Sequence, residues 1–132
     1  MIDESAMLQA ARTVRERAHA PYSRYRVGAA LLDEQGRVHS GCNVENAAHP
    51  QGLCAEAGAL AQLIAAGGQR IKAVVVVGDG AQACTPCGGC RQKLREFASD
   101  DVPVIVADST VVRARFTLGE LLPHSFGPEH LS

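Results

Sequence analysis

The chain has 132 residues, a mass of 13.9 kDa and a formal net charge of −1, and 46% of its residues are hydrophobic but only 4% aromatic. This length allows one compact domain, with a core of small aliphatic side chains. The charge argues against a nucleic-acid surface, which would show a basic stripe. Neither a membrane span of roughly 18 apolar residues nor a secretion signal is visible, so we expect a cytoplasmic protein.

The first half of the chain predicts a helix, a hairpin and a second helix. Apolar residues at three-to-four spacing indicate an amphipathic helix over about Glu4–His19, ended by Pro21. Arg26–Leu32 and Arg37–Asn43 flank a turn signal and predict a β-hairpin. Gly52–Ala66 predicts a helix closed by two glycines. Because this helix is apolar nearly all round, we expect it to be buried.

The second half alternates strands with helices. Ala73–Val77 and Val102–Ala107 are β-branched runs without alternation, typical of strands covered on both faces. Cys90–Ala98 predicts a helix between them, Ala114–Thr117 a short strand and Leu118–Leu122 a helical turn. A hairpin followed by this alternation predicts a three-layer α/β/α sandwich around a mixed five-stranded sheet.

Cysteines begin two of the predicted helices. One group is Cys54-Ala55-Glu56, and the other contains the C-x-x-C turn Cys87–Cys90. In a reducing cytosol, clustered cysteines favour metal or redox chemistry over disulfides. Helix N-termini also favour thiolates. Two thiolates from one turn and a third from another helix would make a zinc site with its fourth position open to water, which is the catalytic pattern.

The acidic residue in the first group fits that chemistry. Zinc lowers the pKa of a bound water, and Glu56 beside the metal could take a proton from it and pass it on as a general acid/base. A carboxylate in so apolar a helix is costly without such a partner.

Other interpretations of the cysteines stay open at this point. A closed structural zinc site could use Cys84 or His49 as its fourth ligand, and Cys42 and Cys84 are otherwise packing or near-site residues. An iron–sulfur site leaves Glu56 unexplained. A thioredoxin-like motif is expected earlier, after the first strand of a βαβ unit. A non-catalytic zinc or nucleoside-binding module would have no need of an acid/base residue.

The combined pattern is more specific than its parts. Cys-Ala-Glu followed by Pro-Cys-x-x-Cys is similar to the zinc-deaminase signature, and on these motifs the chain resembles the cytidine deaminase family in its small, three-cysteine form. The resemblance extends to further motifs in family order, which lie in Pro21–Ala30, Gly41–Ala47, Pro86–Gln92 and Leu121–Pro128.

The resemblance implies a reaction. Cys54, Cys87 and Cys90 would hold one Zn²⁺ per subunit. Glu56 would protonate the pyrimidine N3 as hydroxide attacks C4, and it would then pass a proton to the departing ammonia. The substrates would be cytidine and deoxycytidine, in pyrimidine salvage. The alternative is a deaminase of a modified cytosine nucleoside, N4-substituted or blasticidin S-like.

The resemblance also implies substrate contacts. Asn43 and Glu45 would hydrogen-bond the ribose hydroxyl. Side chains two residues apart on a strand project to the same side, so the amide and the carboxylate could hold one hydroxyl together. The alternative is that both are polar turn residues that close the hairpin. Ala55 would offer its N–H to the base carbonyl. Tyr25 would pack near the base or serve as a core aromatic. Phe126 would complete a neighbour's site in a homotetramer or pack at the terminus.

The chain departs from the family pattern at three positions. Ala57 stands where an arginine often follows Cys-Ala-Glu, and we hypothesise that helix N-termini and Arg91 compensate for its missing charge. Tyr25 replaces phenylalanine, and His49 stands in a tyrosine position. Gly58 inside an apolar helix indicates close packing, so we expect that helix at the tetramer interfaces.

Overall fold

The structure is a computed structural model that describes residues 2–132. Five strands form one sheet in the order β2-β1-β3-β4-β5, where β1 is Val27–Asp33, β2 Val38–Cys42, β3 Ile71–Gly78, β4 Pro103–Ala107 and β5 Val112–Thr117. The helices are α1 Glu4–Arg15, α2 Ala55–Ala65, α3 Gly88–Arg95 and α4 Leu118–Leu121, with 3-10 turns η1 at His49–Gln51 and η2 at Pro128–His130.

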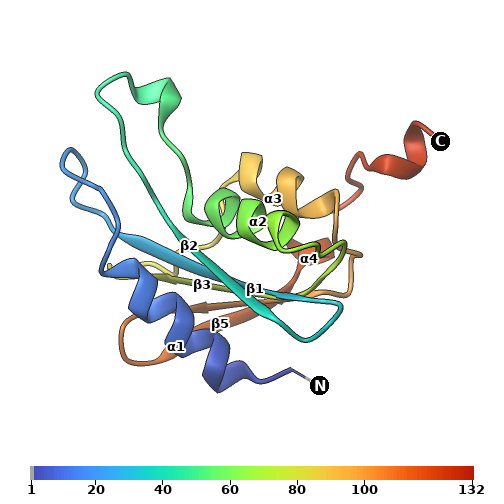
Figure 1. The fold of residues 1–132 in the computed structure, drawn as a ribbon, viewed down its shortest axis with the longest axis horizontal. Coiled ribbons are helices and arrows are strands. Elements are labelled where there is room, and N and C mark those ends of the chain that lie inside the picture. The colour runs from blue at the N-terminus through green and yellow to red at the C-terminus, as the bar shows by residue number, and fades with distance from the viewer. Residues whose placement is uncertain (1) are drawn as a thin grey trace.

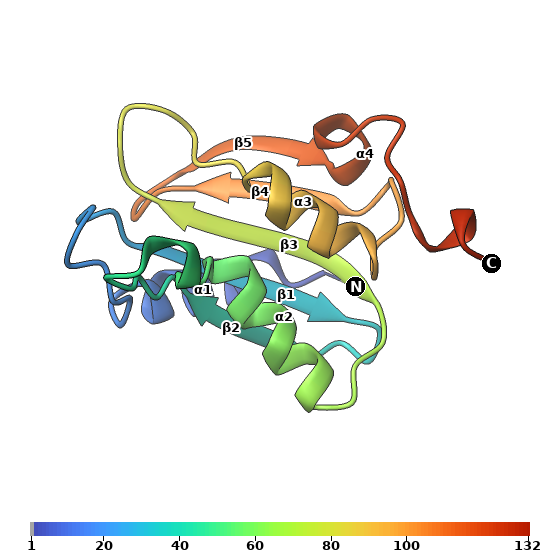
Figure 2. The same ribbon diagram turned by 90° about the horizontal axis from the view of Figure 1, so that it is seen from above.

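The sheet is mixed, as predicted. β1 is antiparallel to both β2 and β3, β3 is parallel to β4, and β4 is antiparallel to β5. The parallel pair is the one joined by a helix, α3, because a parallel connection needs a crossover. Figures 1 and 2 show α1 on one face of the sheet and α2 and α3 on the other.

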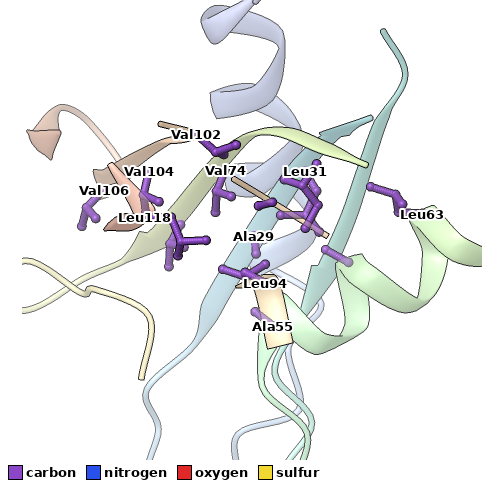
Figure 3. Packing of buried hydrophobic residues seen from close by; sticks show 14 residues of the cluster. Ala29, Leu31, Ala55, Leu63, Val74, Leu94, Val102, Val104, Val106 and Leu118 are labelled. Atoms are coloured by element: carbon purple, nitrogen blue, oxygen red, sulfur yellow. The ribbon is translucent and has the colours of Figure 1, made fainter. Parts of the chain in front are cut away.

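The central strands are buried on both faces, which confirms the prediction from their β-branched runs. Along β3, Val74 and Val76 pack toward α2 and α3, whereas Val75 and Val77 pack toward α1. Side chains alternate between faces along a strand, so a strand between two helical layers must be apolar at every position. Figure 3 shows the cluster on the α2 and α3 side, where Leu63 and Leu94 face the strands.

The helix predicted at Cys90–Ala98 spans Gly88–Arg95 instead. Two other helix boundaries differ from the prediction because the flanking chain pairs with the segment after β2. The first helix ends at Arg15, and not at His19, since the His19 backbone N–H donates to the Asn43 carbonyl at 3.0 Å. The second begins at Ala55, three residues after Gly52, because Leu53 and Val44 exchange two backbone hydrogen bonds of 2.8 Å. Apolar periodicity cannot register such pairings between distant segments.

The expectation that α2 is buried all round is wrong within one chain. Ala55, Ala59 and Leu63 face the sheet, but Ile64 is 44% exposed. The close packing expected at Gly58 is present: its nearest neighbours are backbone atoms of β2 around Gly41, where an added Cβ would collide with the α2 backbone. Among the helices of residues 2–132, none is long and apolar enough to span a membrane.

Candidate active site

The two cysteine groups lie where two helices begin on the same side of the sheet. Cys54 is the N-cap of α2 and Cys87 the N-cap of α3, both in extended conformation, and Cys90 is the third residue of α3. α2 packs over β1 and β2, α3 lies over β3 and β4 (Figure 2), and the two helices contact each other because β1 and β3 are neighbours in the sheet.

The three thiols form one cluster. The Sγ atoms of Cys54, Cys87 and Cys90 all lie within 4.8 Å of one another, with Cys90 buried and the other two exposed. Three sulfurs around one tetrahedral zinc, at Zn–S distances of about 2.3 Å, lie roughly 3.8 Å apart. The cluster therefore fits a zinc ion after a small contraction, and its exposed side is open for a fourth ligand.

Burial acts against ionisation of these thiols. It raises the pKa of Cys54 and, more strongly, that of Cys90. It also acts to raise the pKa of Cys87, but the backbone N–H and the thiol of Cys90, together with the thiol of Cys54, reverse the shift and lower it. Because metal ligands must be thiolates, a bound dication is what would hold all three in the charged form.

Glu56 is a buried carboxyl beside this cluster. It lies in the first turn of α2 and is only 5% exposed. Burial raises its pKa, and its own backbone N–H, the Cys90 thiol and the more distant Lys93 ammonium partly oppose the shift. A carboxyl whose pKa is raised toward neutrality, next to a metal site, is suited to moving protons.

A pocket of about 580 Å³ opens beside the cluster. Its walls come from the loop before β1, the segment after β2 and the segment that leads into α2, and they are lined by Tyr22, Ser23, Asn43, Val44, Glu45, Asn46, His49, Gly52, Leu53 and Cys54. A larger groove of about 910 Å³ runs along the outer side of α1. Only α1 and the two residues after it line that groove, and the thiol cluster lies on the opposite face of the sheet, so the smaller pocket is the candidate substrate site.

Asn43 and Glu45 both line the pocket, and both are held by hydrogen bonds. The Val27 N–H donates to Asn43 Oδ1 at 2.8 Å, and Asn43 Nδ2 donates to the Tyr25 carbonyl at 2.9 Å. Glu45 Oε1 accepts from the backbone N–H groups of Tyr22 and Ser23 at 3.0 and 3.2 Å, and its Oε2 accepts from the Ser23 hydroxyl. The two side chains are therefore fixed before any ligand arrives.

The other predicted substrate residues are placed differently. Ala55 is buried as the first residue of α2, next to Cys54. The Tyr25 side chain lies against Gly78 and Cys84, outside the residues that line the pocket. Phe126 is 55% exposed on the C-terminal segment, where its ring stacks on His130. The segment after α4 projects away from the body of the molecule (Figures 1 and 2).

The positions that depart from the family pattern can also be located. Ala57 is half-buried in α2. Arg91, which we hypothesised to compensate for the missing charge, donates to the carbonyls of Pro86 and Leu121 at 2.6 and 2.7 Å and to the Thr85 hydroxyl at 3.1 Å. These bonds commit its guanidinium to oxygen acceptors. His49 lines the pocket, and its ring lies 5.7 Å from that of Tyr22.

Sequence reasoning missed the role of Ser23 and left that of Cys84 open between metal ligand, packing residue and near-site residue. Ser23 supports Glu45 through both its backbone and its hydroxyl, and Cys84 contacts Tyr25 in front of the metal loop. Ser23 belongs to a Pro-Tyr-Ser motif that marked the resemblance, but its partner lies 22 residues away. Only a contact between distant segments could have revealed either role.

Three thiols at two helix N-termini, a buried carboxyl next to them and a pocket that opens beside them together define the class of zinc-dependent hydrolytic deaminases. Residues 1–106 match the family model described as the cytidine and deoxycytidylate deaminase zinc-binding region. The chain therefore belongs to the cytidine and deoxycytidylate deaminase family.

Individual relatives agree with this assignment. A cytidine deaminase of Sporosarcina psychrophila is 37% identical over 131 residues, which cover 99% of this chain and 96% of that protein. A cytidine deaminase of Mycobacterium tuberculosis is 42% identical over 114 residues, covering 86% and 82%. The crystal structure of cytidine deaminase from Burkholderia pseudomallei is 40% identical and superposes with a TM-score of 0.87, covering 95% of this chain and 100% of that chain.

Proposed function

We propose that this chain deaminates cytidine and deoxycytidine to uridine and deoxyuridine, with water consumed and ammonia released. The observation that carries the proposal is the placement of buried Glu56 against the Cys54, Cys87 and Cys90 cluster. A structural zinc site needs no acid/base residue, and burying a carboxyl without a role costs free energy. The 37–42% identical cytidine deaminases support the choice of substrate.

The residue roles follow from this arrangement. When bound to the three thiolates, zinc supplies the Lewis acid that lowers the pKa of the water that adds to C4 of the pyrimidine. Glu56 accepts a proton from that water and delivers it to N3. It then moves the second water proton to the amino nitrogen on C4, which leaves as ammonia. Ala55, at the first turn of α2, presents its backbone N–H to the base carbonyl.

Asn43 retains an N–H donor and Glu45 retains one acceptor position. The amide nitrogen of Asn43 has two N–H groups, and one is used by the Tyr25 carbonyl. A carboxylate offers about four acceptor positions, and Glu45 uses three of them on Tyr22 and Ser23. A sugar hydroxyl needs one donor for its oxygen and one acceptor for its hydrogen, so the remaining pair matches it.

The test is a substrate panel followed by ultraviolet loss at the cytosine band, with zinc quantified in every sample. We expect turnover of cytidine and deoxycytidine, and full zinc without turnover in Glu56→Ala. Activity retained in that variant would contradict the mechanism. Turnover confined to N4-substituted cytidines or blasticidin S would instead support the alternative substrate class. In that case His49 and Tyr22, which line the pocket, would determine the substrate preference.

We further propose that the chain is one catalytic domain that assembles into a homotetramer, with Phe126 completing a neighbour's site. The support is apolar surface that one chain leaves uncovered, at Val44, Leu53, Ile64 and Phe126. Sedimentation analysis tests the assembly: we expect a tetramer, dissociated by Ile64→Glu, and a monomeric wild type would refute it. Kinetics of Phe126→Ala then test the contribution to the neighbouring site.

A cytoplasmic setting and a role in pyrimidine salvage complete the proposal. Five free thiols, three of them in a metal cluster, suit a reducing compartment. Salvage is the use that a nucleoside deaminase serves, and growth on cytidine as the pyrimidine source, with and without the encoding sequence, tests it.

A further inference from the structure

Tyr25 joins the two halves of the candidate active site. Its backbone carbonyl accepts from Asn43 Nδ2 at 2.9 Å, and its backbone N–H donates to the Ser23 hydroxyl at 3.0 Å. That hydroxyl in turn donates to Glu45. The main chain at Tyr25 is therefore part of the frame that holds both pocket side chains, Asn43 and Glu45.

The side chain of Tyr25 reaches the other half. Its hydroxyl and the thiol of Cys84, three residues before Cys87, lie together against Gly78, which places the phenol to donate to the thiol. Burial and this contact raise the pKa of Tyr25 to about 12, so the phenol keeps its proton and stays a donor.

The same loop is held from its other side by Arg91. The guanidinium of Arg91 donates to the Pro86 carbonyl at 2.6 Å and to the Thr85 hydroxyl at 3.1 Å. The segment from Cys84 to Cys87 is thus held by Tyr25 at its start and by Arg91 in its middle. Arg91 belongs to α3 itself, so Tyr25 is the one of the two that ties this loop to the sugar-binding side.

Gly78 makes room for this contact. A Cβ built on Gly78, the last residue of β3, would lie 2.8 Å from the Tyr25 hydroxyl and 3.0 Å from Cys84 Sγ. Real Cβ atoms do not approach oxygen that closely, so alanine at this position would displace the hydroxyl, the thiol or both. Tyrosine, cysteine and glycine at these three positions form one interdependent set.

We propose that Tyr25 is a positioning residue whose bond to Cys84 fixes the spacing between the sugar-binding pair and the metal-binding loop. The inference rests on the proposed function. A nucleoside is anchored at its sugar while its C4 must reach Glu56 and the thiol cluster. A shift of about 1 Å in such a distance can cost up to roughly 100-fold in rate.

The first test is a cycle of Tyr25→Phe, Cys84→Ala and the double variant, assayed with cytidine. Because both single variants break the same bond, each is expected to lower kcat about 3- to 10-fold with KM within about twofold, and the double variant to match the singles. The proposal would be overturned if the kcat loss of the double variant equalled the product of the two single losses, or if the variants changed KM alone. Cys42→Ala removes another half-buried thiol and is expected to leave kcat unchanged.

A second test uses Gly78→Ala in two backgrounds. In the wild type the added methyl group displaces the phenol hydroxyl, so kcat should fall. In Tyr25→Phe that hydroxyl is absent. The logarithm of the fold-loss in kcat caused by Gly78→Ala should therefore be less than half of its value in the wild type. Equal losses in both backgrounds would overturn the interdependence.

A third measurement does not depend on turnover. In zinc-loaded protein, the rate at which iodoacetamide labels Cys84 is followed by mass spectrometry. We expect Tyr25→Phe to lower this rate, because loss of the phenol donor raises the pKa of the Cys84 thiol and leaves less thiolate, and an unchanged rate would overturn the proposed bond. Failure of the proposed function is seen separately, as a zinc-loaded wild type that turns over no cytosine nucleoside.

Discussion

The two ends of α2 bury two carboxyl groups in contrasting ways. Glu56 lies in the first turn, at the thiol cluster, and burial raises its pKa. Asp33 is the last residue of β1 and lies beyond the other end of α2, where Arg37 from the following turn donates to the carbonyl of Ala66 at 2.9 Å. The side chain of Asp33 has no exposed surface, yet its pKa falls well below the usual range.

Their hydrogen-bond donors explain the difference. Burial acts to raise the pKa of Asp33, but His39 Nε2 and Arg37 Nε lie 2.8 Å from its Oδ2, and the backbone N–H groups of Gln35 and Arg37 donate to Oδ1. Glu56 has weaker partners, its own N–H and the Cys90 thiol. A carboxylate saturated with donors stabilises a fold, whereas an undersupplied one is free to exchange protons.

Removal of the metal is expected to have the largest effect, and only at the Glu56 end. Chelation should abolish deamination and lower the melting temperature, because a ligand that binds the native state stabilises it. Three more thiols should then react with a thiol reagent, from Cys54, Cys87 and Cys90. Zinc should restore all three properties; activity that survives complete zinc removal would contradict the metal assignment.

Glu56→Gln comes next in expected effect. If Glu56 carries the proton as we propose, its loss should lower kcat roughly 10²- to 10⁴-fold. The melting temperature should not fall, because the neutral amide avoids the cost of burying a charge. Zinc content and calorimetry on the same samples separate the two effects. A large loss of stability would mean that Glu56 serves the fold as Asp33 does.

Asp33→Asn should show the reverse behaviour. Breaking a buried ion pair costs 3–5 kcal/mol, and we expect about 3 kcal/mol, the low end of that range, because the Arg37 side chain is 39% exposed and partly screened by solvent. The kcat of the folded enzyme should stay within about twofold. Urea unfolding measures the loss, and Asp101→Asn, at an exposed carboxylate, is the matched control.

A smaller effect is expected from pH. The folded-state pKa of Asp33 is depressed, so its contribution is fully present above the unfolded value of about 3.9 and is lost as pH falls from about 5 downward. The guanidinium of Arg37 and the imidazole of His39 are the groups that face it. Unfolding free energy measured from pH 7 to pH 3 should fall more steeply in the wild type than in Asp33→Asn. Parallel curves would show that Asp33 is not the acid-sensitive group.

Sequence pattern was most informative where a residue's role depends on its near neighbours. The unbroken valines of Ala73–Val77 predicted a strand between two layers, and the spacing of Cys87 and Cys90 predicted two ligands from one turn, since both follow from local backbone geometry. Helix ends were less predictable. Backbone pairing of His19 and Leu53 with the segment after β2 moved two of them.

By itself, then, the sequence determined the mixed sheet between helical layers, the cysteines that gather and the carboxyl placed beside them, because repeat period, helix starts and ligand chemistry act within a few residues. Only the tertiary structure decided which donors each buried carboxyl meets. It also decided that Asn43 keeps an N–H donor and Glu45 an acceptor position, and that Tyr25 reaches Cys84 over Gly78. These properties depend on distances between segments that are far apart in the chain, and such distances are set by packing and not by local preference.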